Sequence, residues 1–228
     1  MIKFMGIIPA LLLMATPAFA DITVRGVGSV SAAPDMAIIR VGVQTKDMNA
    51  TKALKENSTR MNALFTAILG NDKFKLVKAN LQTSQFSIQP AWLYDNNIRV
   101  FEGYTVTNSL TIKVCDLNVI GNIIKTVVEH GGNAARINGI TFTIEDRTAL
   151  EIKARKKAVL DAMAKAKQLA ETAGTHVGSL KSISETSSWQ WPRIPYNSSR
   201  HVGDERSPPI AAGEQTVSIT VNAVFKIY

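Results

Sequence analysis

Side chains that could perform chemistry are few and scattered in this sequence. One cysteine, Cys115, excludes an intramolecular disulfide and a zinc site built from several thiolates. Three histidines, His130, His176 and His201, show no metal-ligand spacing. A lone thiol can be buried, reactive or paired between chains, and we predict burial for Cys115. The sequence therefore predicts no metal site and no cofactor.

Catalytic motifs are also missing. Gly26 and Gly28 begin a dinucleotide-like pattern, but Ser31 replaces its third glycine and a strand follows instead of a helix. We interpret the two glycines as a β-bulge or a close backbone contact. Glu145 and Asp146 are adjacent carboxylates at a predicted strand-to-helix junction, where acidic residues favour a helix N-terminus. We predict that the protein is not an enzyme.

Composition describes an ordinary globular chain. Of 228 residues, 46% are apolar and 19% charged, which excludes a disordered or multi-span membrane protein. The 26 lysines and arginines exceed the 18 acidic residues by eight. This charge suits anionic surfaces but lies below the density of a dedicated nucleic-acid binder, so we predict no nucleic-acid partner.

The first twenty residues have the pattern of a signal peptide. Lys3 precedes an apolar run over residues 4–14, and Ala18 and Ala20 form a small-x-small cleavage site. No later stretch approaches the roughly 20 apolar residues of a membrane-spanning helix. We predict export, cleavage after Ala20 and one soluble domain over residues 21–228.

Hydrophobic periodicity in this domain predicts seven strands and three helices. The predicted strands cover residues 22–30, 36–44, 81–89, 101–114, 137–144, 177–186 and 216–228. The first and third predicted helices cover residues 49–69 and 147–173. The second begins after Asp116, which caps it, and ends at Gly131-Gly132. Alternating strand faces favour an α+β fold, in which helices pack on one side of a mixed, largely antiparallel sheet.

Large aromatic residues lie outside these predicted elements. Trp92 and Tyr94 fall between two predicted strands, while Trp189, Trp191 and Tyr196 fall in residues 187–211. Exposed amphipathic rings favour interfaces, although the rings could also pin their own loops to the domain. The long loop, residues 187–211, contains four prolines and no periodicity. We hypothesise that it packs on a neighbouring subunit.

A basic group lies on the third predicted helix, largely away from its alanine stripe. It consists of Lys153, Arg155, Lys156 and Lys157. A solvated helix face explains these charges, and docking to anionic lipid or polysaccharide is the alternative.

Several loose motifs, taken in order, resemble the SIMPL domain family, also called DUF541. They include Gly26-Val27-Gly28, Pro34-Asp35-Met36-Ala37, Phe86-Ser87-Ile88-Gln89-Pro90, Gly103-Tyr104 and Ala154-Arg155-Lys156-Lys157-Ala158-Val159. Pro209-Ile210-Ala211-Ala212-Gly213-Glu214 and Val221-Asn222-Ala223-Val224-Phe225 resemble its periplasmic immunogenic protein branch. The resemblance implies an exported bacterial α+β protein of the periplasm or outer membrane that is antigenic, linked to stress tolerance and oligomeric. It supplies no catalytic residues.

Three function classes remain open. A self-assembling structural or interaction protein of the periplasm fits the missing chemistry, the aromatics and the expectation of unpaired strands at both chain ends. A membrane-associated, pore-like oligomer is the second, because the last strand alternates and ends at Tyr228. A small-ligand binder or enzyme is the third. We expect a homo-oligomer with peripheral contact to a membrane or envelope polymer.

The long loop provides a first test. Replacing Trp189 and Trp191 together by alanine should give a folded but smaller species in analytical ultracentrifugation. Truncating an interface tryptophan costs about 2–4 kcal/mol, enough to weaken assembly roughly 30- to 1000-fold. An unchanged oligomer would contradict the hypothesis, and loss of folding would place both rings in the subunit core.

Overall fold

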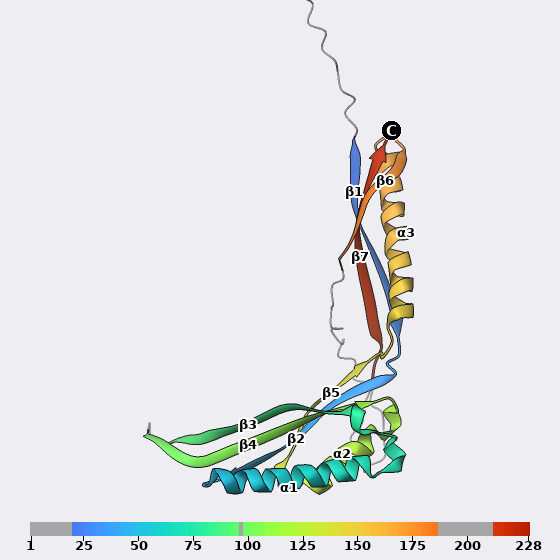
Figure 1. The fold of residues 1–228 in the computed structure, drawn as a ribbon. Helices are drawn as coiled ribbons and strands as arrows, with labels where there is room; N and C mark the ends of the chain where they lie inside the picture. Colours follow the sequence, from blue (N-terminus) through green and yellow to red (C-terminus); the bar gives the residue numbers. More distant parts are fainter. Residues whose placement is uncertain (1–19, 96–97, 187–211) are drawn as a thin grey trace, which may run out of the picture. The chain divides into compact units, whose positions relative to one another are not determined.

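The described residues of the computed structural model form two compact units. They comprise residues 20–95, 98–186 and 212–228. Unit 1 takes its described residues from Met1–Ser29, Glu151–Gln190 and Ser218–Tyr228, and unit 2 from Val30–Leu150 and Trp191–Val217. The α+β class is confirmed, but the strands divide between two antiparallel sheets, whereas the sequence analysis expected one (Figure 1).

The elements follow the predicted order. The strands are β1 (Asp21–Ala32), β2 (Met36–Asp47), β3 (Leu81–Asp95), β4 (Ile98–Val114), β5 (Ala135–Thr143), β6 (Val177–Thr186) and β7 (Gln215–Ile227). The α-helices are α1 (Ala50–Leu69), α2 (Ile120–Gly131) and α3 (Thr148–Thr172). Asn49 caps α1, and Asp146 caps α3 by accepting a hydrogen bond from Thr148 N at 2.9 Å. Hydrogen bonds from Thr148 also lower the pKa of Asp146, as expected for an acid at a helix N-terminus.

Trp92 and Tyr94 correct one prediction, because they lie within β3 and not in an irregular segment. The sequence analysis ended this strand before Pro90. In the structure β3 is an edge strand that pairs only with β4. A proline at a sheet edge need not remove a ladder hydrogen bond, so pairing continues through Pro90 to Asp95.

In unit 1, α3 packs directly on sheet A, whose strand order is β1-β7-β6. The helix contacts the sheet with a buried alanine stripe of Ala154, Ala158, Ala162, Ala166 and Ala170. A Cβ atom at Gly26 or Gly28 would overlap the carbonyl oxygens of Ala158 and Ala154. The glycines therefore mark the close backbone contact that was one of their two predicted roles.

The outer edge of β1 is closed by side chains of α3. Asp161 accepts a hydrogen bond from Val27 N at 2.8 Å. Lys157 and Lys165 donate to the carbonyl oxygens of Ser29 and Arg25, each at 3.1 Å. These bonds occupy backbone groups that would otherwise be free to pair with another strand. The hydrogen bond from Lys165, followed by the one from Val27, lowers the pKa of Asp161.

β1 and β7 also correct the expectation of unpaired strands at both chain ends. β7 is the central strand of sheet A, with β1 on one side and β6 on the other. β1 pairs with β7 on one edge and meets α3 on the other. Neither strand leaves an edge like that of β3.

In unit 2, α1 and α2 cover one face of sheet B, whose strand order is β3-β4-β2-β5 (Figure 1). The core between them contains Ile39, Val41, Val43, Leu64, Ile68, Leu110, Ile112, Ile123 and Val127. Asn57 of α1 is fully buried, and its Nδ2 donates to Val43 O at 2.9 Å and Val106 O at 3.1 Å. This amide ties α1 to β2 and β4. The opposite face of sheet B has no helix over it among the described residues.

The α3–β1 contact predicts a strong substitution effect. Gly28→Ala should destabilise the protein by about 1–3 kcal/mol or more, because the added Cβ must push backbone away from backbone. The measurement is chemical denaturation followed by circular dichroism. Val27→Ala, which shortens a half-exposed neighbour, should change stability far less. Equal effects of the two substitutions would contradict this role of Gly28.

Candidate interaction surface

The β3–β4 hairpin extends beyond the rest of sheet B. The pairing of β2 with β4 ends where Asp47 lies opposite Tyr104. Past that point β3 and β4 pair only with each other, so residues 91–95 and 98–103 form a two-stranded ribbon (Figure 1). We call this ribbon the hairpin arm. An isolated two-stranded hairpin is marginally stable in water, which favours an arm that packs against something else.

One face of the hairpin arm carries an aromatic cluster. Trp92 lies opposite Phe101, and the two rings meet edge to face with centroids 5.2 Å apart. Phe101 makes a second such contact with Tyr104 at 5.3 Å. The guanidinium carbon of Arg99 lies 4.2 Å from the centre of the Trp92 ring, a cation–π contact. The rings are therefore held in place while their outer surfaces remain in solvent.

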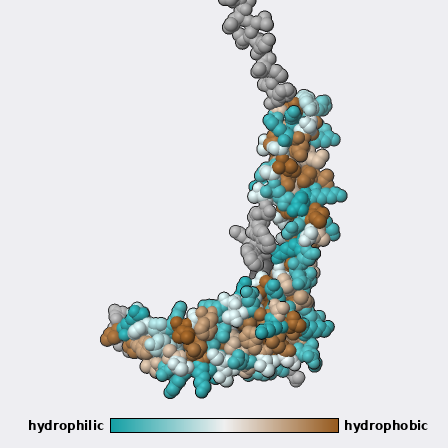
Figure 2. Space-filling model, in the orientation of Figure 1, coloured by the Kyte–Doolittle hydropathy of each residue, from teal (hydrophilic) through white to brown (hydrophobic). Residues whose placement is uncertain are grey.

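The other face of the hairpin arm is apolar as well. Leu93 and Val100 lie opposite each other in the register, and Ile98 follows near the turn. Ile98 is 67% exposed and Leu93 is half exposed, whereas Tyr94, 72% exposed, lies on the aromatic face with Trp92. Figure 2 shows brown, hydrophobic residues among the hydrophilic ones toward this end of the hairpin. A contiguous exposed apolar surface of this kind marks an interaction site.

A bulge fixes the base of the hairpin arm. Ala91 lies opposite Gly103 and Trp92 opposite Phe101, which leaves Glu102 as an extra residue in β4. Gly103 has a φ of +106°, a conformation that favours glycine. The Glu102 carboxylate pairs with Lys46 of β2. The bulge thus sets the direction in which the arm leaves the sheet.

β3 also presents a long free edge. Its residues from Leu81 to Tyr94 include no charged side chain. Among the described residues, β4 is its only strand partner. Proteins commonly protect such edges with lysine, short strands or a covering element. β3 contains a bulge and Pro90. Unlike β1, however, it has no described side chains that hydrogen-bond to the backbone groups of its free edge.

The structure brings some of the predicted interface residues together. Trp92 and Tyr94 lie in the hairpin arm, whereas Trp189, Trp191 and Tyr196 lie outside the described residues. The sequence analysis missed Leu93, Ile98, Val100 and Phe101. The sequence signal for these residues is that apolar residues follow one another without polar residues between them, both before and after Asp95-Asn96-Asn97. Because successive residues of a strand point to opposite faces, such a run makes both faces of the ribbon apolar.

The basic group on α3 is partly engaged by its own unit. Arg155 pairs with Glu185 of β6, with Nε 2.6 Å from Oε2, and Lys157 donates to Ser29 O. Lys153 and Lys156 are exposed and make no ion pair with another described residue. The prediction that these residues contact an anionic surface stays a prediction.

Cys115 corrects the prediction of burial, because the structure places it at the surface. It follows Val114, the last residue of β4, and its side chain is exposed at the end of the strand. Its Sγ lies 3.9 Å from Oε2 of Glu145. Partial desolvation, followed by the charges of Glu145 and Asp35, raises the pKa of this thiol. The group is therefore mainly a neutral thiol at neutral pH.

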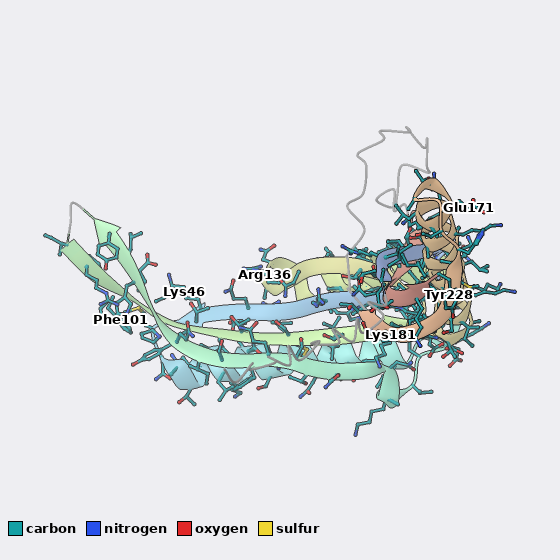
Figure 3. All side chains as sticks on the ribbon, turned by 90° about the horizontal axis from the view of Figure 1, so that it is seen from above. Lys46, Phe101, Arg136, Glu171, Lys181 and Tyr228 are labelled. Carbon is teal, nitrogen blue, oxygen red and sulfur yellow. The ribbon has the colours of Figure 1, made fainter. Side chains whose placement is uncertain are left out.

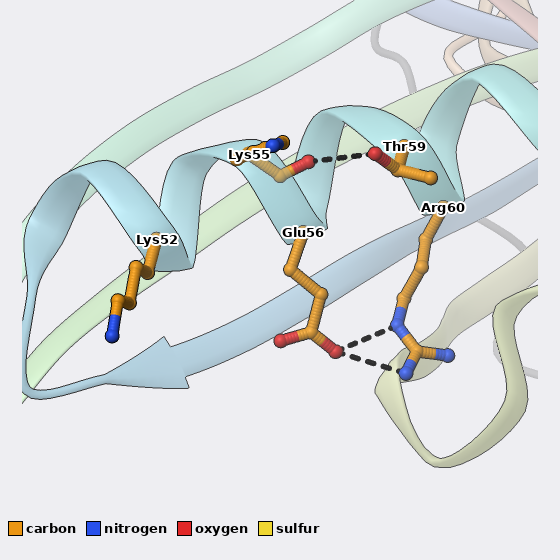
Figure 4. A pocket seen from close by; sticks show the side chains of 5 residues that line it. All are labelled: Lys52, Lys55, Glu56, Thr59 and Arg60. Carbon is orange, nitrogen blue, oxygen red and sulfur yellow. Dashed lines mark hydrogen bonds and ion pairs between the residues drawn. The ribbon is translucent and has the colours of Figure 1, made fainter.

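A shallow hollow of about 410 Å³ lies on α1 over Lys52, Lys55, Glu56, Thr59 and Arg60. Figure 4 shows that its polar groups engage one another. Glu56 pairs with Arg60 at 2.9 Å, and the Thr59 hydroxyl donates to Lys55 O at 2.9 Å. The hollow contains no nucleophile next to a general base. Among the described residues, no three His, Cys, Asp or Glu side chains gather as metal ligands.

None of the described helices combines the length and apolar character needed to cross a bilayer. The features that stand out are thus an apolar ribbon and a free strand edge on an α+β scaffold.

Comparison with known proteins identifies the family. Residues 22–225 match the family described as "SIMPL: Protein of unknown function (DUF541)". The chain is a member of the SIMPL family, as its motifs suggested.

Comparison with three relatives makes the assignment more specific. The chain is 34% identical over 217 residues to the 26 kDa periplasmic immunogenic proteins of Brucella melitensis and Brucella abortus, covering 91% of this chain and 85% of each relative. It is 22% identical over 162 residues to the uncharacterized protein YggE of Escherichia coli K12, covering 71% of this chain and 64% of that protein. These relatives support an exported protein of the bacterial cell envelope, located in the periplasm.

The environment of Cys115 predicts slow alkylation. Because its pKa is raised, less thiolate is present at pH 8 than in the unfolded chain, and iodoacetamide should react more slowly with the folded protein. Glu145→Gln removes a nearby charge and should increase the rate several-fold. Glu129→Gln, on α2, is the matched control. A folded-state rate that Glu145→Gln leaves unchanged would show that the carboxylate does not control the thiol.

Proposed function

We propose that this protein is a structural protein of the periplasm that assembles with copies of itself through the hairpin arm. The observation that carries the proposal is the apolar two-stranded ribbon, which exposes side chains on both faces beyond the edge of β2. Exposed Trp92 and Tyr94 are residue types that dominate binding energy at interfaces. The contacts of Trp92 with Phe101 and Arg99 reduce the conformational entropy lost on association.

The free edge of β3 supports the same proposal. An extended strand from another copy could pair with its backbone, which would add directional hydrogen bonds to the apolar contacts of the arm. The edge of β1 offers no such site, since α3 side chains occupy it. Assembly through β3 would therefore have a defined direction.

The proposal includes export and removal of the first twenty residues. The start of β1 at Asp21 supports a boundary near this position, and the carbonyl oxygen of Ala20 also accepts a hydrogen bond from Ile227 N at 3.1 Å. Stress protection and association with the outer membrane, which the family resemblance implied, stay predictions. So does the expectation that the protein is not an enzyme.

The hairpin arm provides the test. Trp92→Ala combined with Tyr94→Ala should yield a folded protein of lower mass in light scattering at the same concentration. Loss of hot-spot aromatics weakens an interface by about 2–4 kcal/mol, roughly 30- to 1000-fold in the dissociation constant. Circular dichroism should remain unchanged because the arm lies outside the core of unit 2.

Leu160→Ala is the matched control, since it shortens an exposed apolar residue on α3. Its mass should equal that of the unchanged protein. A mature protein that is monomeric at micromolar concentration, or an oligomer insensitive to the double substitution, would overturn the proposal.

A further inference from the structure

The open face of sheet B, on the side away from α1 and α2, differs sharply from the hairpin arm. Alternate residues of β2 such as Ile39, Val41 and Val43 are buried beneath the helices. The residues between them face outward, together with their partners in the register. Apart from the partly buried Ile38, this polar face includes Arg40, Gly42, Gln44, Lys46, Gln82, Gln85, Ser87, Gln89, Thr105, Thr107, Ser109, Thr111, Lys113 and Arg136.

The polar face is rich in hydroxyls and amides, with excess positive charge. Its cations are Arg40, Lys46, Lys113 and Arg136. Glu102, paired with Lys46 at the base of the hairpin arm, is the carboxylate that reaches it from the described parts of the four strands. Figure 3 looks onto this face with α1 behind the strands, and Lys46 and Arg136 lie along it.

The centre of the polar face holds a strip without long side chains. Gly42 lies between Ser109 of β4 and Arg136 of β5, and Arg40 lies between Thr111 and Gly139. A Cβ at Gly42 would lie 3.2 Å from Ser109 Oγ, so this hydroxyl projects over the glycine on the open side. A Cβ at Gly139 would meet no heavy atom within 4 Å. Two arginines therefore flank a strip of small residues, in which Gly42 and Ser109 are themselves buried.

Ser109 is an unsatisfied polar group in this strip. Its side chain is 5% exposed, and its Oγ has no hydrogen-bond partner among the described residues. Buried hydroxyls are normally hydrogen-bonded, and those that are not require an explanation. The Ser109 hydroxyl is itself inaccessible to solvent, so it is not offered to a ligand.

The two arginines differ in how they are held. Arg136 donates from Nε to Gln44 Oε1 at 3.0 Å and from Nη1 to two backbone carbonyl oxygens, which leaves Nη2 without a described partner. Arg40 makes no side-chain hydrogen bond or ion pair with a described residue. The first guanidinium is thus oriented in advance, and the second is free to bind an anion.

We infer that the polar face binds an acidic polysaccharide, with Arg40 and Arg136 on carboxylate groups and the exposed glutamines on sugar hydroxyls. Charge complementarity requires an anionic ligand. The many neutral donors and acceptors match a hydroxylated chain. Ile38, which is partly buried, is a large apolar residue that β2 places on this face, but the face offers little of the apolar area that a protein interface or a membrane surface would use. Its residues differ from those of the hairpin arm and from those of the basic group of α3.

The test measures binding of polygalacturonate to the full-length mature protein by isothermal titration calorimetry at physiological salt. The wild type should bind polygalacturonate and not neutral dextran. Arg40→Gln with Arg136→Gln should weaken binding at least about tenfold, as expected for loss of charge-assisted hydrogen bonds. Ser109→Ala, which removes a hydroxyl that solvent does not reach, should leave binding unchanged.

Lys153→Gln with Lys156→Gln removes the same charge from α3 and should leave binding unchanged. Poly-L-glutamate, which has carboxylates but no sugar, should bind at least about tenfold more weakly than polygalacturonate. Equal binding of the two polymers, equal losses in the α3 control, or full binding by the double arginine variant would each overturn the inference. Light scattering on the arginine variant should show unchanged assembly, which separates this site from the proposed oligomer contact.

Discussion

Unit 1 depends on the approach of the α3 backbone to the backbone of β1. The contact is possible because β1 has glycine at positions 26 and 28 and because α3 presents only the methyl groups of its buried alanines. The helix then lies close enough for Lys157, Asp161 and Lys165 to reach the edge of the strand. Because interiors are close-packed, one added methyl group at this contact would displace both elements.

The two sheets treat their edges in opposite ways. In sheet A, hydrogen bonds from α3 occupy the edge of β1 and prevent pairing with another chain. In sheet B, β3 continues past the supporting strands, stays uncharged and carries aromatic residues into solvent. Of these two edges, β3 is therefore the one that leaves backbone groups free for a strand of another chain. This contrast favours specific assembly over general strand pairing.

The sequence predicted the individual helices and strands better than it predicted how the strands are arranged in sheets. Asn49, Gly70 and the periodic residues of α1 carried enough information to place that helix almost to the residue. The division into two sheets was not predictable, because strand periodicity reports which face is buried and not which strand is the neighbour. Cys115 was misplaced for a related reason, since burial at a strand end depends on whether another element covers it.

The candidate interaction surface was predictable only in part. Trp92 and Tyr94 attracted attention by residue type, but Pro90 concealed that they belong to a strand. The polar face of sheet B gave no sequence signal, because its residues come from four strands and their spacing in the chain is unrelated to their register. Such a site becomes visible only when the pairing of every strand is known.

The central place of β7 in sheet A has a consequence for the order of folding. β1 is the first strand of the exported domain, and the partner beside it is the last. A chain that emerges with its N-terminus first holds β1 unpaired until the C-terminus has crossed the membrane. Most of unit 2, by contrast, comes from one continuous stretch and has all four strands of its sheet by Thr143. Completion of translocation is therefore the event that permits unit 1 to close, and a chain truncated before β7 would leave Gly26, Gly28 and the alanine stripe of α3 without the sheet that orders them.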